Sequence, residues 1–332
     1  MKALIDEVVH AYFETPGYEI DSVPFGLTNV TKIVTIEADK YVIRIYNRHT
    51  KSVQSLELEA AITSFLSERA LSFRVPEFVR SLSGNEYISM SDGTLGAVVT
   101  FLKGSAPELS SVRHAVDFGK VVGELSNALE QFEADRLSYR GKSFSEFYGL
   151  HPLADRAAVA AFIENPPFPI AEDQLLFYES MVSSIEKSAH LLKDLPTQLV
   201  HHDLLIFNLL ADENGIRGVL DFDFVSVDAR CMELAISLNH VLQMSGGSME
   251  MAEAFVKGYA EQGKCTSPEI ERLELLTRIY HIAVLHIYIG QHYSGHDVER
   301  SFNYIMNQFS DRKLWLEKNG PAVRKLLESY CL

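Results

Sequence analysis

The chain contains little cysteine, and its cysteines show no pairing pattern. Its 332 residues include Cys231, Cys265 and Cys331, an odd number spread far apart in the sequence. Secreted proteins stapled by disulfides carry cysteines in pairs, and zinc sites carry them at short fixed spacings. The sequence therefore argues against a disulfide framework and against a cysteine zinc site. It favours a reducing compartment, of which the cytoplasm is the simplest.

Basic residues are scarce relative to acidic ones. The chain has 30 lysines and arginines against 45 aspartates and glutamates, a formal net charge of -15 at pH 7. Nucleic acids need a cationic protein face, so DNA and RNA are disfavoured, while a small anion held through a metal ion stays open. No apolar run approaches the roughly 20 residues that span a bilayer. The acidic start, MKALIDE, does not fit a secretory signal peptide. We expect neither a nucleic-acid nor a membrane partner.

Glycine-rich nucleotide motifs are missing as well. The sequence has no Gly-x-x-x-x-Gly-Lys-Ser/Thr phosphate loop and no Gly-x-Gly-x-x-Gly turn. One segment, GLTNVT at 26–31, could form a turn over a nucleotide and would place Thr28 beside it. With a single glycine, that segment taken alone favours an ordinary turn.

The first third of the chain is rich in strand-forming residues. β-Branched and aromatic residues predict a hairpin over 29–47 and a second β-rich stretch that runs from Pro76 to Gly104. Apolar residues at helical spacing predict helices over 3–13 and 53–69 in the same part.

The rest of the chain is dominated by helical patterns. Only 197–225 has strand character there, and the expected helices cover 109–134, 171–194, 232–244, 249–262, 268–290, 297–316 and 321–330. A chain of this length usually divides into two subdomains. We therefore predict an α+β protein with a small β-rich lobe over 1–103 and a larger, mainly helical lobe over 104–332.

The most informative stretch is HHDLLIFN at 201–208, followed by GVLDFD at 218–223. The dipeptide Asn214-Gly215 predicts a two-residue hairpin turn, and that register places Asn208 opposite Asp221. Opposed residues lie roughly 4.5–5.5 Å apart, and their oxygens are the hard ligands that Mg²⁺ prefers. Asp203 enters the same turn and could take a proton from a hydroxyl beside a metal-bound phosphate. A longer turn would shift this register by about a residue.

Other polar residues near this stretch have less certain roles. Asp223 shares a face with Asp221, and two interpretations stay open: a second carboxylate near the metal, or a solvated side chain. The adjacent histidines His201 and His202 should point to opposite faces, which disfavours a shared metal site. We expect a structural hydrogen-bonding role for His201 and assign none to His202.

Arg44 and Glu59 form the second candidate pair. Glu59 lies on the apolar stripe of the helix expected from Val53, and a carboxylate in that position needs a cationic partner. Arg44, in the strand before it, can supply that partner. An arginine fixed in this way could present its guanidinium to phosphate oxygens. Taken alone, Arg44 could also be an ordinary exposed residue of a strand.

Some polar residues of the helical part have simple explanations. Glu233 begins a helix, where an acidic side chain suits the helix dipole. His286, His292 and His296 are interrupted by glycines, which argues against a helical metal site. We expect these histidines to line a groove or the surface.

Taken together, these segments resemble the superfamily of aminoglycoside phosphotransferases, choline kinases and homoserine kinases, whose fold is similar to that of protein kinases. The resemblance rests on the pattern His-x-Asp-x-x-x-x-Asn at 201–208 and on the strand that ends in Asp221-Phe222. It implies that Asp203 orients or deprotonates an acceptor hydroxyl and that Asn208 and Asp221 hold Mg²⁺.

The resemblance also implies a nucleotide site. Arg44 falls where the family places a phosphate-contacting base, and Glu59 falls at the helix partner of that base. Thr100 and Leu102 fall in the connector whose backbone would meet adenine. The run MELAISLN at 232–239 reads most like the homoserine kinase branch, although Glu233 stands where the family commonly has aspartate.

The implied function is ATP- and Mg²⁺-dependent phosphorylation of a hydroxyl group on a small molecule. The acceptor stays open between a homoserine-like amino alcohol, a choline-like compound, an aminoglycoside and a sugar. Substrate contacts are expected around Phe147, Tyr148, Asn239 and the 281–296 region.

Two other functions compete with this one. A degenerate kinase could bind a nucleotide or a protein partner without catalysis, and an aspartyl phosphatase could use Asp221 and Asp223 as its pair. The phosphatase expects an α/β sheet downstream, where this chain predicts helices. A protein kinase is disfavoured because Asp223 replaces the glycine of Asp-Phe-Gly and no Ala-Pro-Glu follows.

Overall fold

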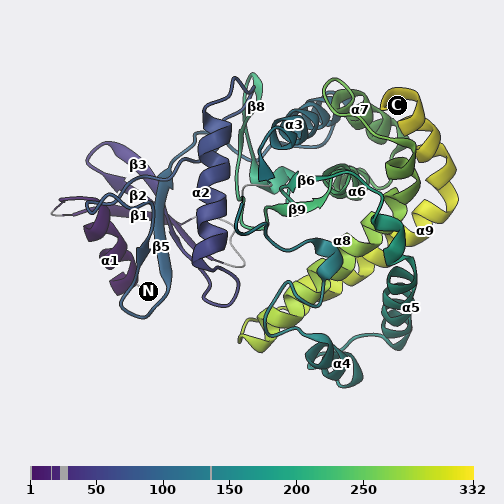
Figure 1. The fold of residues 1–332 in the computed structure, drawn as a ribbon, viewed down its shortest axis with the longest axis horizontal. Coiled ribbons are helices and arrows are strands. Elements are labelled where there is room, and N and C mark those ends of the chain that lie inside the picture. Colours follow the sequence, from purple (N-terminus) through teal and green to yellow (C-terminus); the bar gives the residue numbers. More distant parts are fainter. Residues whose placement is uncertain (1, 16, 23–28, 135–136) are drawn as a thin grey trace.

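The computed structural model describes residues 2–15, 17–22, 29–134 and 137–332. Within them, a small antiparallel sheet with two helices forms one lobe, and a mostly helical second lobe follows it in the chain (Figure 1). This confirms the predicted α+β, protein kinase-like, two-lobed fold. Below, α1, α2 and β1–β5 are called the N-terminal lobe, and everything from α3 onward is called the helical lobe.

The N-terminal lobe is built on a five-stranded sheet in the order β1-β2-β3-β5-β4. Its strands are β1 (Glu19–Ser22), β2 (Val30–Ile36), β3 (Asp39–Ile45), β4 (Ile88–Ser89) and β5 (Leu95–Thr100). The predicted hairpin is confirmed: Ile36 pairs with Asp39 across a tight turn in which Glu37 has φ 57°. The alternating apolar residues of β2 and β3 meet α1 (Lys2–Tyr12), and together they form a separate small core.

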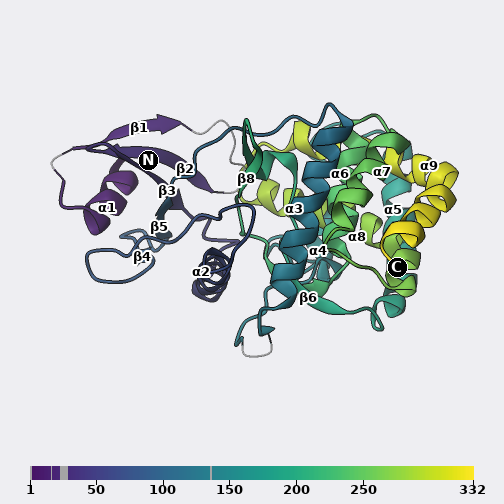
Figure 2. The same cartoon turned by 90° about the horizontal axis from the view of Figure 1, so that it is seen from above.

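Helix α2 (Val53–Ser67) stands between the sheet and the helical lobe (Figures 1 and 2). It begins at a capping box, in which Ser52 and Ser55 each accept a hydrogen bond from the backbone N–H of the other. That cap fixes where the helix starts and so directs Glu59, two turns later, toward the space between the lobes. Glu59 is buried there.

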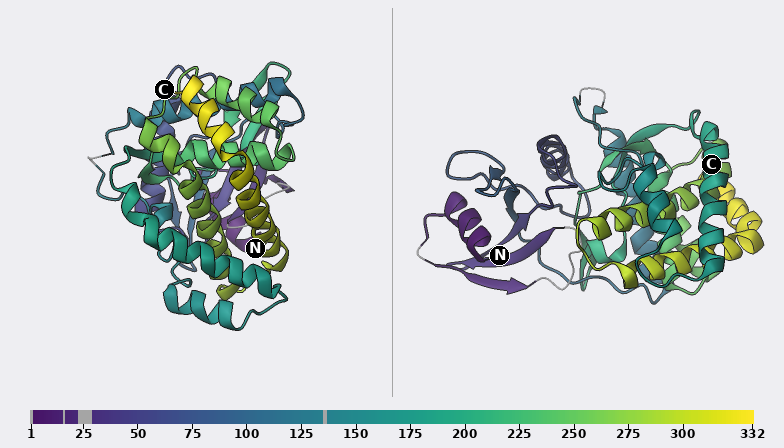
Figure 3. Two further views of the ribbon diagram at one scale, coloured as in Figure 1. Left: turned by 90° about the vertical axis from the view of Figure 1, so that its right-hand side faces the viewer. Right: turned by 90° about the horizontal axis from the view of Figure 1, so that it is seen from below.

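The helical lobe packs seven helices of the described chain around the larger core (Figures 2 and 3). They are α3 (Val112–Glu130), α4 (Arg156–Glu164), α5 (Glu172–Ser188), α6 (Met232–Met244), α7 (Met249–Tyr259), α8 (Ser267–Tyr293) and α9 (Glu299–Tyr330). Two short ribbons lie among them, β6 (Thr197–Val200) with β9 (Ser226–Ala229), and β7 (Leu209–Asp212) with β8 (Gly215–Val219). None of the helices that the structure describes is both long and apolar enough to cross a membrane.

Two helix predictions need correction. The segments expected at 297–316 and 321–330 form the single helix α9, which continues through Pro321. Proline removes one intrahelical hydrogen bond, but Val323 and Leu327 beyond it are buried, and their packing keeps the helix continuous. Helix α4 was not predicted, because it is short and only Val159, Phe162 and Ile163 of it are buried.

The predicted register of the β7–β8 hairpin is wrong. Asp212 pairs with Gly215, so the turn is Glu213-Asn214, and a bulge between Leu210 and Ala211 then shifts the pairing by one residue. As a result the backbone N–H of Leu220, and not of Asp221, donates to Asn208, at 2.8 Å. A shift of one residue turns a side chain to the other face of a strand. Asp221 compensates by leaving the strand in a left-handed conformation, φ 63°.

Helices α3 and α7 approach each other through glycines. A Cβ at Gly119 would overlap the carbonyl oxygen of Phe255, and one at Gly258 would overlap the carbonyl oxygen of Val116. We therefore expect Gly119→Ala to lower the free energy of unfolding by about 1–3 kcal/mol, because the two backbones must separate. Urea unfolding followed by circular dichroism measures this.

The matched control for this substitution is Gly320→Ala in α9, where an added Cβ meets nothing within 4 Å. Alanine there should leave stability unchanged or raise it by about 0.4–1 kcal/mol, because it restricts the unfolded chain. Equal unfolding midpoints for the two variants would mean that the α3–α7 contact is not closely packed.

Candidate active site

Asp203 and Asn208 are held together in the loop between β6 and β7. The side-chain nitrogen of Asn208 donates to the backbone oxygen of Asp203 at 2.8 Å and to Asp203 Oδ2 at 2.7 Å. His201 stiffens the same loop, since its Nδ1 accepts from the backbone N–H of Asp203 at 3.2 Å and its Nε2 lies 2.9 Å from the backbone oxygen of Leu220. His201 thus makes the structural hydrogen bonds expected from the sequence.

Two side chains of helix α6 hold this loop through hydrogen bonds to its backbone. Glu233 is 1% exposed, and its Oε2 accepts from the backbone N–H of His201 at 2.6 Å. One turn later, Ser237 donates to the backbone oxygen of Leu204 at 3.0 Å. Burial raises the pKa of the Glu233 carboxyl to about 7. The helix-dipole explanation of Glu233 was therefore incomplete, because the side chain also holds the loop that carries Asp203.

His202 forms a second support that the sequence did not indicate. Its Nδ1 lies 3.1 Å from the backbone oxygens of both Val200 and Phe224, and its Nε2 lies 2.9 Å from Asp228 Oδ2. The ring thus connects the backbone at the end of β6 to the segment before β9 and to the Asp228 carboxylate. Its ring stacks on Phe144 with centroids 4.3 Å apart.

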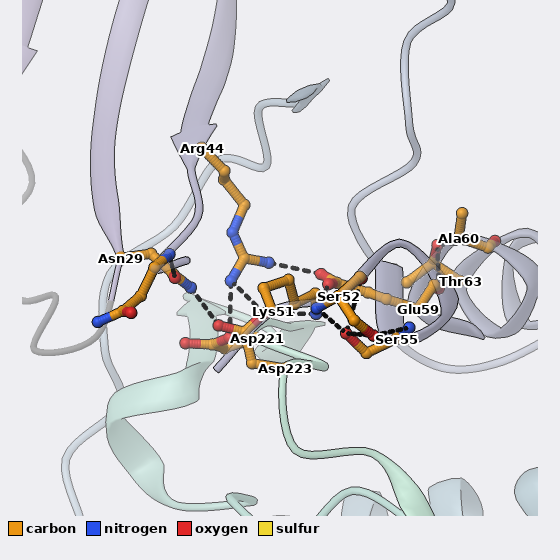
Figure 4. A network of polar contacts seen from close by, with 11 residues as sticks. Asn29, Arg44, Lys51, Ser52, Ser55, Glu59, Ala60, Thr63, Asp221 and Asp223 are labelled. Carbon is orange, nitrogen blue, oxygen red and sulfur yellow. Dashed lines mark hydrogen bonds and ion pairs between the residues drawn. The ribbon is translucent and has the colours of Figure 1, made fainter. Parts of the chain in front are cut away.

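Asp221 and Asp223 face the N-terminal lobe and meet a group of cations there (Figure 4). Arg44 Nη1 contacts Glu59 Oε1 at 2.6 Å, which confirms the pair predicted from the sequence. Arg44 Nη2 lies 3.0 Å from Asp221 Oδ1 and 2.9 Å from Asp223 Oδ1. The guanidinium therefore links α2 to the residues that follow β8, and so joins the two lobes.

Lys51 is the member of this group that no pattern in the sequence indicated. Its ammonium contacts Glu59 Oε2, and it lies 2.9 Å from Asp223 Oδ1. The side chains of Lys51 and Asp223 are 3% and 10% exposed. The only signal in the sequence was the place of Lys51 directly before the cap of α2, which does not say where its side chain points.

Asp223 is not the solvated residue that one interpretation allowed. It accepts from Asn29 in addition to Lys51 and Arg44. Burial alone would raise the pKa of its carboxyl, but Arg44 and Lys51 outweigh burial, and the pKa lies below its ordinary value. Asp223 is thus a charged anchor between the lobes in this structure.

The residues around Asp203 suit a divalent cation. Burial raises the pKa of the Asp203 carboxyl well above its ordinary value, and the nearby charge of Asp221 raises it further. A cation between the two carboxylates would relieve this repulsion, and oxygen donors suit Mg²⁺. The nitrogen of Asn208 is committed to Asp203, so the amide oxygen is the atom left for a metal. In the described chain no group of three His, Cys, Asp or Glu is placed to hold a metal.

The residues expected near a nucleotide lie between the lobes where the structure describes them. Thr100 ends β5 and accepts from the backbone N–H of Glu77 at 2.9 Å. Leu102 follows it, and its Cδ1 would lie 3.4 Å from a Cβ at Gly218 of β8. Thr28 lies outside the described residues. Among the residues expected to contact the substrate, Asn239 already makes a hydrogen bond within the protein. Its side-chain oxygen accepts from Arg312 Nε at 2.8 Å.

Comparisons with known proteins agree with this architecture. The model of the "Phosphotransferase enzyme family" matches residues 19–276. A homoserine kinase of Methylobacillus flagellatus is 24% identical over 221 residues, which cover 67% of this chain and 63% of that protein. A homoserine kinase of Methylobacterium radiotolerans is 24% identical over 284 residues, 83% of this chain and 81% of that protein. The solved structure of an amicoumacin kinase in complex with AMP-PNP and Ca²⁺ has a TM-score of 0.68 and 17% identity, and covers 94% of this chain and 93% of that one.

Proposed function

The chain belongs to the phosphotransferase enzyme family and is a small-molecule kinase, and we propose that it transfers a phosphoryl group from ATP to the hydroxyl of a homoserine-like amino alcohol. The observation that carries the proposal is the loop of Asp203 and Asn208, which lies beside Asp221 and faces the cations of the N-terminal lobe. The homoserine kinases among the relatives support the acceptor class.

Asp203 is the proposed base. Its carboxylate would accept a hydrogen bond from the acceptor hydroxyl and take the proton as that oxygen bonds to phosphorus and the bond to the leaving diphosphate breaks. The loop contacts of Asn208 and His201 hold Asp203 in place while this happens. Phosphoryl transfer depends mainly on such positioning and on the neutralisation of charge.

Asn208 and Asp221 are the proposed ligands of Mg²⁺. When bound, the ion would supply positive charge to the phosphate oxygens. In this structure Asp221 Oδ1 is paired with Arg44. We propose that Asp221 turns to the metal when nucleotide binds, and that Arg44, still held by Glu59, then presents Nη2 to the phosphates.

These proposed roles assign a different task to each lobe. Residues 1–103 would hold the nucleotide, with the backbone of Thr100 and Leu102 against adenine, Arg44 and Glu59 near the phosphates and Thr28 in the turn above them. Residues 104–332 would carry the catalytic loop and the acceptor site. Hydrogen bonds between the backbones of Ser105 and Ala211, 2.8 and 3.2 Å long, tie the connector between the lobes to β7 beside that loop.

The test of the proposed function is direct. The protein is incubated with ATP, Mg²⁺ and a panel of hydroxylated amino acids, amino alcohols, aminoglycosides and sugars, and products are identified by mass spectrometry. A phosphorylated homoserine-like compound is expected, and it should not form without Mg²⁺. Nucleotide binding with no transfer to any acceptor would instead describe a degenerate kinase.

Replacing the metal carboxylate gives a separate prediction. Asp221→Ala should weaken Mg²⁺-dependent nucleotide binding by at least about tenfold, or ~1.4 kcal/mol. Without metal, affinity should stay unchanged or rise, because Arg44 loses a competing carboxylate. Calorimetric titration with a non-hydrolysable ATP analogue, with and without Mg²⁺, measures both values, and Asp194→Ala on the exposed surface is the control. Equal losses in the two titrations would contradict a metal role for Asp221.

A further inference from the structure

His151 has a buried ring nitrogen with no hydrogen-bond partner among the residues that the structure describes. The residue is 1% exposed, and its Nδ1 accepts from the backbone N–H of Leu153 at 3.2 Å. The hydrogen of the neutral ring must then sit on Nε2, and Nε2 is buried with no hydrogen-bond partner in the part of the chain that the structure describes. A buried donor left unpaired is costly, so each one calls for an explanation, such as a ligand or an ordered water.

The neighbours of His151 are basic and come from both lobes. The ring of His49, in the loop after β3, has its centroid 6.3 Å from that of His151. The ammonium of Lys142 donates to the backbone oxygen of Gly149, close in the chain to His151. His296 follows α8, and a Cβ on Gly290 of that helix would overlap the His151 ring.

Burial and these basic neighbours change the pKa of His151 in the same direction. The pKa of His151 is lowered to about 4, first by burial and then by repulsion from His49, His296 and Lys142. No carboxylate opposes them by raising the pKa of His151. The cluster is therefore short of negative charge in a chain of net charge -15. The histidines are not a cation site, since the described residues contain no group of three such ligands placed to hold a metal.

The chain segment that carries Lys142 is bonded to β9, the strand that pairs with the one before the catalytic loop. The segment that contains Lys142 is fixed there, because Ser226 donates to the Lys142 backbone oxygen and Phe144 N–H donates to Asp228, both at 2.8 Å. Phe144 in turn stacks on His202, the neighbour of Asp203. From the other side, Tyr288 of α8 is close enough to Asp203 for the carboxylate to raise the pKa of its hydroxyl after burial.

We propose that His49, Lys142, His151 and His296 form a subsite for a carboxylate of the acceptor. The His151 Nε2–H donates to that carboxylate, Lys142 supplies positive charge, and the two outer histidines border the subsite. The inference rests on the proposed function and narrows it. Among hydroxylated acceptors, the enzyme selects those that carry an acid group, and simple cationic alcohols are poor substrates.

The test uses acceptor pairs that differ only by the carboxylate: homoserine and 3-aminopropan-1-ol, serine and 2-aminoethanol, threonine and 1-aminopropan-2-ol. Whichever pair is phosphorylated, the acid should have the higher kcat/KM. His151→Phe keeps a ring and removes the donor, and it should lower kcat/KM for the acid by about 10–100-fold, mostly through KM, as expected for a lost hydrogen bond to a charged group. The ratio of kcat/KM for the acid to kcat/KM for its partner without the carboxylate should therefore fall.

A second variant tests the subsite without changing the buried His151, whose replacement could disturb folding. His49 and His296 are exposed, so the double variant His49→Ala/His296→Ala should fold normally and still reduce the preference for the acid. His190→Ala, at an exposed histidine in the short 3-10 helix that follows α5, is the matched control and should not alter the preference.

The outcomes separate the two proposals. No phosphoryl transfer to any compound means that the proposed function fails. In that case calorimetric titration with homoserine decides the subsite, and binding that is absent or insensitive to His151→Phe overturns it. Transfer without preference for the acid, or a preference that survives both sets of variants, overturns the subsite and leaves the kinase assignment in place.

Discussion

Asp203→Asn should lower kcat by about 10²–10⁴-fold, the usual cost of losing a positioned catalytic base. Asparagine keeps the shape of the side chain but cannot take the proton of the acceptor hydroxyl. Nucleotide affinity should change little, because the proposed metal ligands Asn208 and Asp221 remain. Steady-state kinetics on the acceptor identified by the panel, combined with calorimetric titration of a nucleotide analogue, separates the two effects.

The pH dependence follows from the raised pKa of Asp203. Only the ionised carboxylate can act as a base, and burial together with Asp221 raises its pKa. The rate of the wild-type enzyme should therefore rise with pH through that pKa and fall as pH drops below it. The residual rate of Asp203→Asn should lack this limb. Normal turnover by the variant, or an identical pH profile, would remove Asp203 from the proposed mechanism.

The sequence was informative where partners lie close together in the chain or in one pattern. The β2–β3 hairpin, helix α2 and the Arg44–Glu59 pair, whose members are 15 residues apart, followed from strand alternation and helical spacing. The loop contacts between Asp203 and Asn208 span five residues. In each case the local period decides which side chains share a face.

The sequence was less informative where a side chain contacts a residue far away in the chain, or where the backbone departs from regular secondary structure. Lys51 contacts Asp223 across 172 residues, and His201 meets Glu233 across 32. No spacing rule relates such positions. The β7–β8 register failed for another reason, since a bulge and the left-handed backbone of Asp221 replaced a regular ladder. Bulges are local adjustments of twist and pairing that a two-residue turn rule does not contain.

The buried ion pair between Lys51 and Asp223 should make a large contribution to stability. Both side chains are almost fully covered, and removing one member of a buried pair typically costs about 3–5 kcal/mol because the other charge stays buried and unpaired. We expect Asp223→Asn to show this loss of stability. Without the Asp223 charge, Lys51 and Arg44 have only Glu59 as a common buried carboxylate partner. Lys51→Met should cost less, because Arg44 and Asn29 still contact Asp223.

A double-mutant cycle isolates the pair. Urea unfolding of Lys51→Met, Asp223→Asn and the combined variant gives the coupling free energy, and the combined variant should be more stable than the sum of the single losses predicts.

The contribution of this pair to stability should be lost at both low and high pH. The folded-state pKa of Asp223 lies below its ordinary value, so its contribution is present above that value and is lost as pH falls through the folded pKa. The pKa of Lys51 is raised, since Asp223 and Glu59 outweigh burial, and its contribution is lost as pH rises through that pKa.

The same pair should affect catalysis through the position of the lobes. Lys51 is anchored beside α2, and Asp223 follows the proposed metal ligand Asp221 by two residues, so the pair holds that carboxylate in front of Arg44. Lys51→Met at a temperature where it remains folded should therefore raise the Mg²⁺ concentration needed for half-maximal rate, whereas Lys40→Met, in the exposed pair with Asp21, should not. An additive double-mutant cycle together with an unchanged Mg²⁺ requirement would mean that the two charges act independently and that the lobes are positioned by other contacts.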